Sequence, residues 1–118
     1  MTYGEVERMA NVEGLQKTLE YIKEHPDEWS QYRWHTCFAG IAVRVLKGAV
    51  LDDRGCCNQC RWLTLDGHTL TSFDIADLAV AALELTPEQD EDLFHGDNTL
   101  EDLERIVAEI AAEAAVSA

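Results

Sequence analysis

Thiols offer the most reactive candidate chemistry in this sequence. Cys57 and Cys60 form a C-x-x-C pair, and His35 and Cys37 lie two residues apart farther upstream. Zinc takes about four nitrogen or sulfur ligands in a tetrahedron, and a C-x-x-C turn presents two thiolates to one ion. These four residues are therefore the candidate ligands of a zinc site.

The spacing does not complete a zinc motif, because a second C-x-x-C is missing. Cys37 begins a strongly apolar segment, where a free cysteine usually behaves as a small hydrophobic residue. A thiol enzyme is less favoured still, because a helix N-terminus or nearby cations usually lower a reactive thiol's pKa, and here the pair precedes an expected strand in an acidic chain. The sequence thus favours no metal, no cofactor and no catalytic residue. A zinc-stabilised module using Cys57 and Cys60 is the alternative.

The charge of the chain is strongly uneven. The net charge is −14, and residues 62–118 hold fourteen acids and one base, whereas residues 1–61 hold nine acids and eight bases. A field of this sign repels phosphate backbones and anionic membranes, so we expect neither direct nucleic-acid binding nor membrane binding. It favours a protein partner with a basic surface, and a purely solvating role is the competing explanation.

Two groups of residues are candidates for contacting such a partner. The first consists of acids near the beginnings of the last two expected helices: Asp90, Glu91, Asp92, Glu101 and Glu104. The second is an aromatic group with one cation, a composition typical of energetic centres in protein interfaces: Trp29, Tyr32, Arg33 and Trp34.

Hydrophobic periodicity and capping residues predict the elements of the first half. A helix is expected over 12–24, with Asn11 as its N-cap, and another over about 37–47, with Thr36 at its start. Residues 49–51 suggest a short strand. Asp66-Gly67 is a favoured two-residue turn, so residues 63–65 and 68–70 should form a hairpin.

The second half is expected to be helical. A helix over about 73–85 should begin at Thr71 or Ser72, and a capping box at 86–89 should open a short helix that ends near Phe94. Another capping box, at 98–101, should open the last helix, where Arg105 has Glu101 and Glu109 at helical spacing. The residues expected in the core are Phe38, Ile41, Val45, Phe73, Ala76, Val80, Leu83, Leu103, Val107 and Ile110.

These elements predict an α+β fold, mostly α, with four or five helices around one core and a small antiparallel β-hairpin. We expect one domain over 1–118, with a loosely ordered start (1–10), a cysteine-containing loop (52–60) and a frayed tail (114–118). The sequence has no apolar run of about 20 residues and no signal-peptide pattern, so a cytoplasmic location is expected.

Two stretches carry a resemblance to a known group. Residues 11–29 with 37–43, and residues 85–89 with 93–94 and 97–103, resemble a family of small uncharacterised proteins of actinobacteria and their phages. The resemblance implies an origin and a fold but no activity. Together with the charge, it leads us to expect a non-catalytic acidic protein-binding module, such as a phage or prophage accessory factor acting on a host protein.

Overall fold

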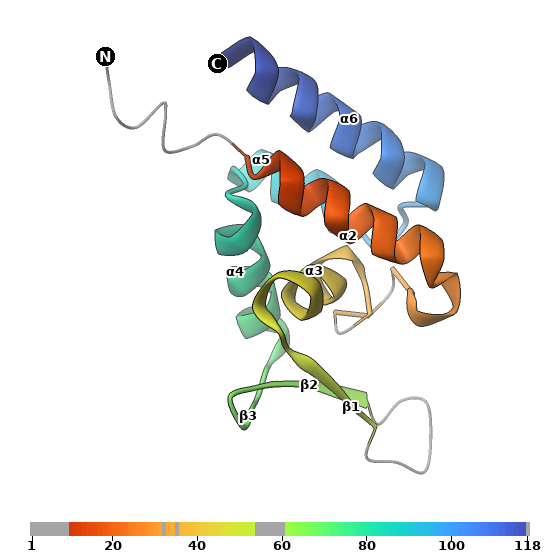
Figure 1. Ribbon diagram of the computed structural model, residues 1–118, viewed down its shortest axis with the longest axis vertical. Helices are drawn as coiled ribbons and strands as arrows, with labels where there is room; N and C mark the ends of the chain where they lie inside the picture. The colour runs from red at the N-terminus through yellow and green to blue at the C-terminus, as the bar shows by residue number, and fades with distance from the viewer. Residues whose placement is uncertain (1–9, 32, 35, 54–60, 118) are drawn as a thin grey trace.

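The computed structural model describes residues 10–31, 33, 34, 36–53 and 61–117. In that part of the chain, five α-helices and one 3-10 turn accompany a three-stranded antiparallel sheet, which confirms the prediction of a mostly α α+β fold (Figure 1). The elements are α2 (Val12–Glu24), η1 (Pro26–Glu28), α3 (Phe38–Lys47), β1 (Val50–Asp53), β2 (Arg61–Leu65), β3 (His68–Thr69), α4 (Ser72–Leu83), α5 (Pro87–Leu93) and α6 (Leu100–Ser117).

Helix α3 lies at the centre of the core. Its first six residues are all buried, and it packs against both α2 and α4. Helix α6 lies alongside α2, on the side away from the sheet (Figure 1). The expected core residues Phe38, Ile41 and Leu103 are fully buried, and Val107 and Ile110 are nearly so.

The start of α2 follows the prediction and adds a close helix contact. Asn11 accepts the backbone N–H of Gly14 at 3.0 Å and donates through its side-chain amide to the carbonyl of Ala82 at 3.1 Å. A β-carbon on Gly14 would lie 3.0 Å from a methyl of Leu46 and 2.7 Å from the Asn11 amide nitrogen. Glycine therefore permits the close approach of α2 to α3.

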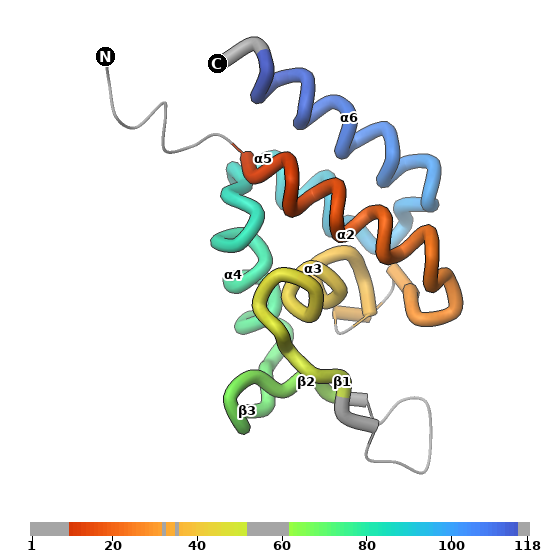
Figure 2. Tube along the Cα trace, viewed as in Figure 1, coloured from red at the N-terminus to blue at the C-terminus, as the bar shows by residue number. Residues whose placement is uncertain are grey.

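The sheet contains the expected hairpin and one further strand. Leu65 pairs with His68 across Asp66-Gly67, and both turn residues have positive φ, as a type I′ turn requires. Strand β1 pairs antiparallel with β2, with Leu51 opposite the buried Leu63. The chain passes from α3 into the sheet and continues from it into α4 (Figure 2).

Helix α4 presents a face to the core that differs in part from the one predicted. Phe73 was expected to be buried and is 80% exposed, whereas Ile75 and Ala79, which were not expected in the core, are buried; the predicted burial of Leu83 is confirmed. The helix carries few charges, so apolar residues occupy several faces and the sequence alone gives no unique buried face. The helix also ends earlier than expected, because Glu84 adopts a left-handed conformation with φ of 54°.

The caps of the helices follow the sequence with two corrections. The capping box at Thr86 and Gln89 is present as predicted. Thr36 does not cap α3, because its hydroxyl donates to the carbonyl of Ser30, and Cys37 is the N-cap residue. The last capping box lies one residue later than predicted, with Thr99 and Asp102 as its two partners.

The expected loose start and cysteine loop fall almost wholly outside the described residues. Helix α6 continues to Ser117, and fraying of its end stays a prediction. Among the helices that the structure describes, none is both long and apolar enough to cross a bilayer.

Candidate partner-binding surface between α5 and α6

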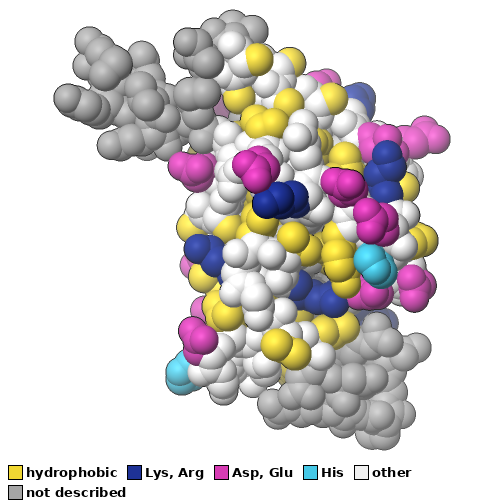
Figure 3. Space-filling model, viewed as in Figure 1, with side chains coloured by type: hydrophobic (Ala, Val, Ile, Leu, Met, Phe, Trp, Pro, Cys, Tyr) yellow, Lys and Arg dark blue, Asp and Glu magenta, His cyan; other side chains and the backbone are white. Residues whose placement is uncertain are grey.

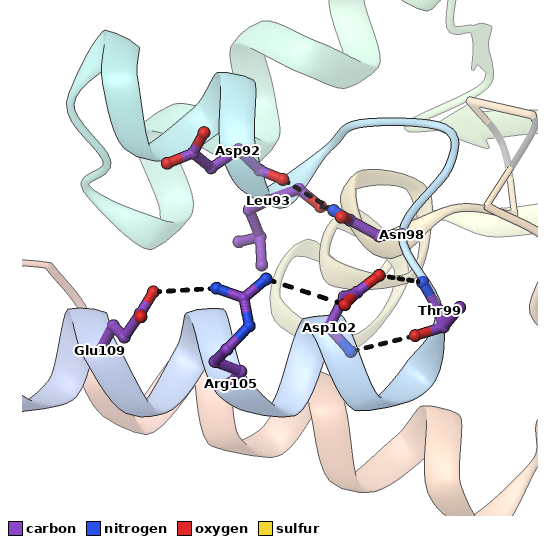
Figure 4. Close-up of polar contacts among 7 residues, drawn as sticks. All are labelled: Asp92, Leu93, Asn98, Thr99, Asp102, Arg105 and Glu109. Carbon is purple, nitrogen blue, oxygen red and sulfur yellow. Dashed lines mark hydrogen bonds and ion pairs between the residues drawn. The ribbon is translucent and has the colours of Figure 1, made fainter.

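The two C-terminal helices meet along a seam rich in carboxylates. Leu93 of α5 is fully buried there, and the side-chain amide of Gln89 donates to a Glu113 carboxylate oxygen at 3.3 Å. The side-chain amide of Asn98 donates to the carbonyl oxygens of Asp92 and Leu93 at 2.7 and 3.2 Å (Figure 4). Asn98, predicted to cap α6, thus closes the carboxyl end of α5.

Arg105 points into this seam and is paired there. Its guanidinium nitrogens lie 3.7 Å from an Asp102 oxygen and 3.4 Å from a Glu109 oxygen (Figure 4). The predicted pairing with Glu109 is confirmed, but Asp102 takes the place predicted for Glu101. The backbone N–H of Thr99 is the main cause of the lowered pKa of Asp102.

A small hollow opens between the two helices. It has a volume of about 280 Å³, and its described lining includes Asp92, His95, Arg105 and Glu109. We call Asp92, Asp102, Glu109 and Glu113, with Arg105 among them, the acidic seam. No cluster of three or more His, Cys, Asp or Glu side chains suited to a metal ion occurs in the described ranges.

The predicted acids on α5 differ in exposure. Glu91 and Asp92 are exposed, and neither carboxylate has a hydrogen bond or ion pair with another described residue. Asp90 is half-buried; burial, followed by the nearby charge of Glu91, raises its pKa. Of the three α5 acids that were predicted to contact a partner, Glu91 and Asp92 are therefore the ones exposed to solvent.

The predicted acids on α6 do not all share this surface. Glu104 lies on the flank of α6 that faces α2, where its carboxylate is 3.8 Å from the Lys23 ammonium. Glu101 is exposed. Figure 3 shows the side of the molecule formed by α2 and α6, where acidic and basic side chains are interleaved. Helix α5 carries acids and no base, so it adds negative charge to the seam.

The aromatic candidates are only partly available to a partner. Trp34 is 41% exposed and packs edge-to-face on Phe94, with ring centroids 6.2 Å apart. Trp29 is half-buried, and its indole N–H donates to the side-chain oxygen of Gln31 at 2.9 Å. Arg33 is half-buried, and Tyr32 lies outside the described residues.

Gln31 is a central polar residue that the sequence did not reveal. It is 6% exposed, and its amide nitrogen donates to the carbonyls of Leu93 and His95 at 3.1 and 3.0 Å. Its amide oxygen also accepts the backbone N–H of Phe38 at 3.2 Å. The Gln31 side chain thus caps the amino end of α3, although it lies seven residues before Phe38, and links that end by hydrogen bonds to the end of α5. Because its partners at the end of α5 are backbone carbonyls, which every residue has, no pattern of residue types in the sequence identifies them.

A second polar cluster joins α2, η1 and α3. The Tyr21 hydroxyl and an Arg44 guanidinium nitrogen both donate to one Glu28 carboxylate oxygen, at 2.7 and 2.9 Å. The hydrogen bond from Tyr21, with Arg44 assisting, lowers the pKa of Glu28 despite partial burial. This cluster holds the turn that leads into Trp29 and Gln31.

The thiol candidates are only partly described. Cys37 is 2% exposed, its Sγ donates to the Trp34 carbonyl at 3.6 Å, and burial raises its thiol pKa. It therefore lies in the core as a small hydrophobic residue, as expected. His35, Cys57 and Cys60 lie outside the described residues.

Comparison with known proteins gives no family for this chain. No family model, no curated protein and no solved structure matches it.

Proposed function

We propose that this protein is a non-catalytic binding module that docks a basic protein through the acidic seam and the adjoining acids of α5. We further propose that the protein is a cytoplasmic accessory factor of a phage or prophage and that it acts on a host protein. The observation that supports the proposal is that Arg105 is already paired. Arg105 is the only Lys or Arg in residues 62–118, and it forms ion pairs with Asp102 and Glu109.

The consequence of that pairing is an uncompensated negative surface. Glu88, Glu91 and Asp92 are exposed on α5, and no described residue pairs with their carboxylates. Acids at the first turn of a helix are favoured by the helix dipole, which accounts for Glu88. The dipole does not account for Glu109 and Glu113, which lie toward the carboxyl end of α6.

Such a surface accelerates association with a basic protein. Long-range attraction raises the rate of encounter, and salt screens it over about 8 Å at physiological ionic strength. The binding energy itself should come from contacts made after encounter, because exposed ion pairs contribute only about 0–1 kcal/mol each.

The first experiment reverses the charge of the α5 acids. The partner is captured from a host lysate with the wild-type protein, and its association rate is then measured against salt concentration. The double variant Glu91→Lys/Asp92→Lys should associate more slowly and show a weaker salt dependence. The matched control is Glu20→Lys/Glu24→Lys, which makes the same charge change on exposed positions of α2.

The control distinguishes a local surface from net charge. Equal slowing in both double variants would mean that overall charge, and not the α5–α6 surface, steers binding. An unchanged rate and salt dependence in the α5 variant would mean that these acids only solvate the protein. Thermal unfolding of each variant checks that the fold is intact.

A further inference from the structure

A second and larger hollow lies where the segment after η1 meets the loop between α5 and α6. Its volume is about 390 Å³, near the lower end of the range of roughly 300–1,000 Å³ that is usual for ligand pockets. Trp29, Ser30 and Gln31 form one wall, and Gly96, Asp97 and Thr99 belong to the other.

Hydrogen bonds hold both walls in place. Gln31 accepts the indole N–H of Trp29 at 2.9 Å and donates to the carbonyl of His95 at 3.0 Å, so one side chain joins the two walls. The backbone N–H of Asp97 donates to Nδ1 of His95 at 3.1 Å. The pocket is therefore preorganised, which lowers the entropic cost of filling it.

The chemistry of the walls favours a cation. The described lining contains no Lys or Arg, and the Asp97 carboxylate is exposed with no partner among the described residues. Because Gln31 occupies the indole N–H of Trp29, the ring has only its apolar surface left for a ligand. A tryptophan ring face is the best aromatic surface for an ammonium or guanidinium group.

The amino end of α6 would on its own favour an anionic ligand in the pocket, because the helix dipole is positive there. Glu101 and Asp102 lie in the first turn of α6, and the Asp102 carboxylate accepts the backbone N–H of Thr99 at 3.0 Å. These two acids compensate the dipole locally, so the amino end of α6 does not by itself favour an anion.

We infer that this pocket, the Trp29–Asp97 pocket, receives a Lys or Arg side chain of the basic partner, with its cation between the Trp29 ring and the Asp97 carboxylate. The inference rests on the proposed function, because it names the contact that follows electrostatic encounter. It places the anchor beside the acidic seam, with Asn98 belonging to the lining of both hollows.

The test is a titration of the ¹⁵N-labelled full chain, followed by NMR, with N-acetyl-arginine methylamide. The neutral isostere N-acetyl-citrulline methylamide is the matched probe. The arginine probe should shift the Trp29 indole N–H and the amides of Gly96, Asp97 and Thr99, and the citrulline probe should leave them in place. Equal shifts with both probes, or none with arginine, would overturn the pocket assignment.

Two substitutions then locate the cation. Asp97→Asn should weaken binding of the arginine probe by about two- to fivefold, the loss of one exposed ion pair. Glu88→Gln, which removes one exposed charge on α5 outside the pocket, should have a smaller effect. Equal effects of these two substitutions would show that the probe senses only the general field.

Gly96→Ala tests the space itself. A β-carbon at Gly96 would lie 3.7 Å from the Gln31 carbonyl oxygen, an ordinary contact, and so the variant should fold while the pocket narrows. Binding of the arginine probe should weaken, and unchanged binding would contradict the assignment.

The two proposals can fail separately. Charge reversal on α5 tests electrostatic steering and leaves the Trp29–Asp97 pocket intact, whereas the arginine probe tests the pocket without any partner. Slower partner association in the α5 variant together with a negative probe titration would retain the proposed function and reject the anchor.

Discussion

A glutamine side chain offers two N–H donors and two acceptor positions, and Gln31 uses all four inside the protein. A buried donor or acceptor that loses its partner costs about 1–3 kcal/mol. The side chain therefore determines how the turn before α3 meets the end of α5. An isolated polar residue in a polar stretch of sequence gives no sign of this role.

Replacing Gln31 with leucine should destabilise the fold by about 2–4 kcal/mol, because the Trp29 indole N–H and the Phe38 amide would each lose an acceptor. The measurement is the free energy of unfolding in urea. Gln16→Leu, at an exposed position of α2, is the control and should change stability by less than about 0.5 kcal/mol. Equal losses in the two variants would contradict the role assigned to Gln31.

At the scale of the element, helix ends were predicted better than helix faces. Asn11, Thr71 and Thr86 cap their helices as the sequence indicated, because a cap depends on residues three apart that lie close together in any fold. The last cap shows the limit of such reasoning. Asn98-Glu101 and Thr99-Asp102 both fit a capping pattern, and the structure uses the second because Asn98 closes α5.

The position of this capping box can be tested by substitution. Thr99→Ala should cost about 0.5–2 kcal/mol of stability, whereas Glu101→Ala, which removes a side-chain acceptor that no capping bond uses, should cost less. If the predicted capping box at Asn98 and Glu101 were the correct one, Glu101→Ala would be the more damaging change. Urea unfolding of both variants decides between the two.

Asp102 adds a pH dependence with a definite sign. Its pKa is lowered in the folded protein, chiefly by the Thr99 backbone N–H, so its contribution to stability is present above the unfolded value of about 3.9. That contribution is lost as the pH falls through the folded pKa. The stability difference between wild type and Asp102→Asn should therefore shrink in acid, and a difference that stays constant with pH would contradict this role.

At the scale of the whole molecule, the core can be read from the sequence wherever a helix has one clearly apolar face. The predicted core positions in α3 and α6 that become fully or nearly buried are Phe38, Ile41, Leu103, Val107 and Ile110. Helix α4 has apolar residues on several faces, so only its packing on α3 determines which are buried. The acidic character of the candidate surface could be predicted from the sequence. The ion pair between Glu104 and Lys23 could not, because it depends on how α2 and α6 approach each other in the fold.

Two substitutions can test which residues belong to the core, because their effects on the free energy of unfolding should differ. Ile41→Ala should destabilise the protein by about 2–5 kcal/mol, because a fully buried side chain leaves a cavity. Phe73→Ala removes a larger side chain that is 80% exposed, and should change stability by less than about 0.5 kcal/mol. A large loss at Phe73 would mean that α4 buries the face first predicted.

The bonds from Gln31 to the end of α5 also bear on the order of folding. They join positions 62 and 64 residues apart, so closing that loop costs more chain entropy than pairing α2 with the nearby α3. We expect contacts of this kind to form late and to open early, so that the docking of α5 behaves as a local equilibrium of its own. A partner side chain in the Trp29–Asp97 pocket would bridge both sides of this junction. Binding would then slow hydrogen exchange at the amides of α5, at a distance from the residues that the partner touches.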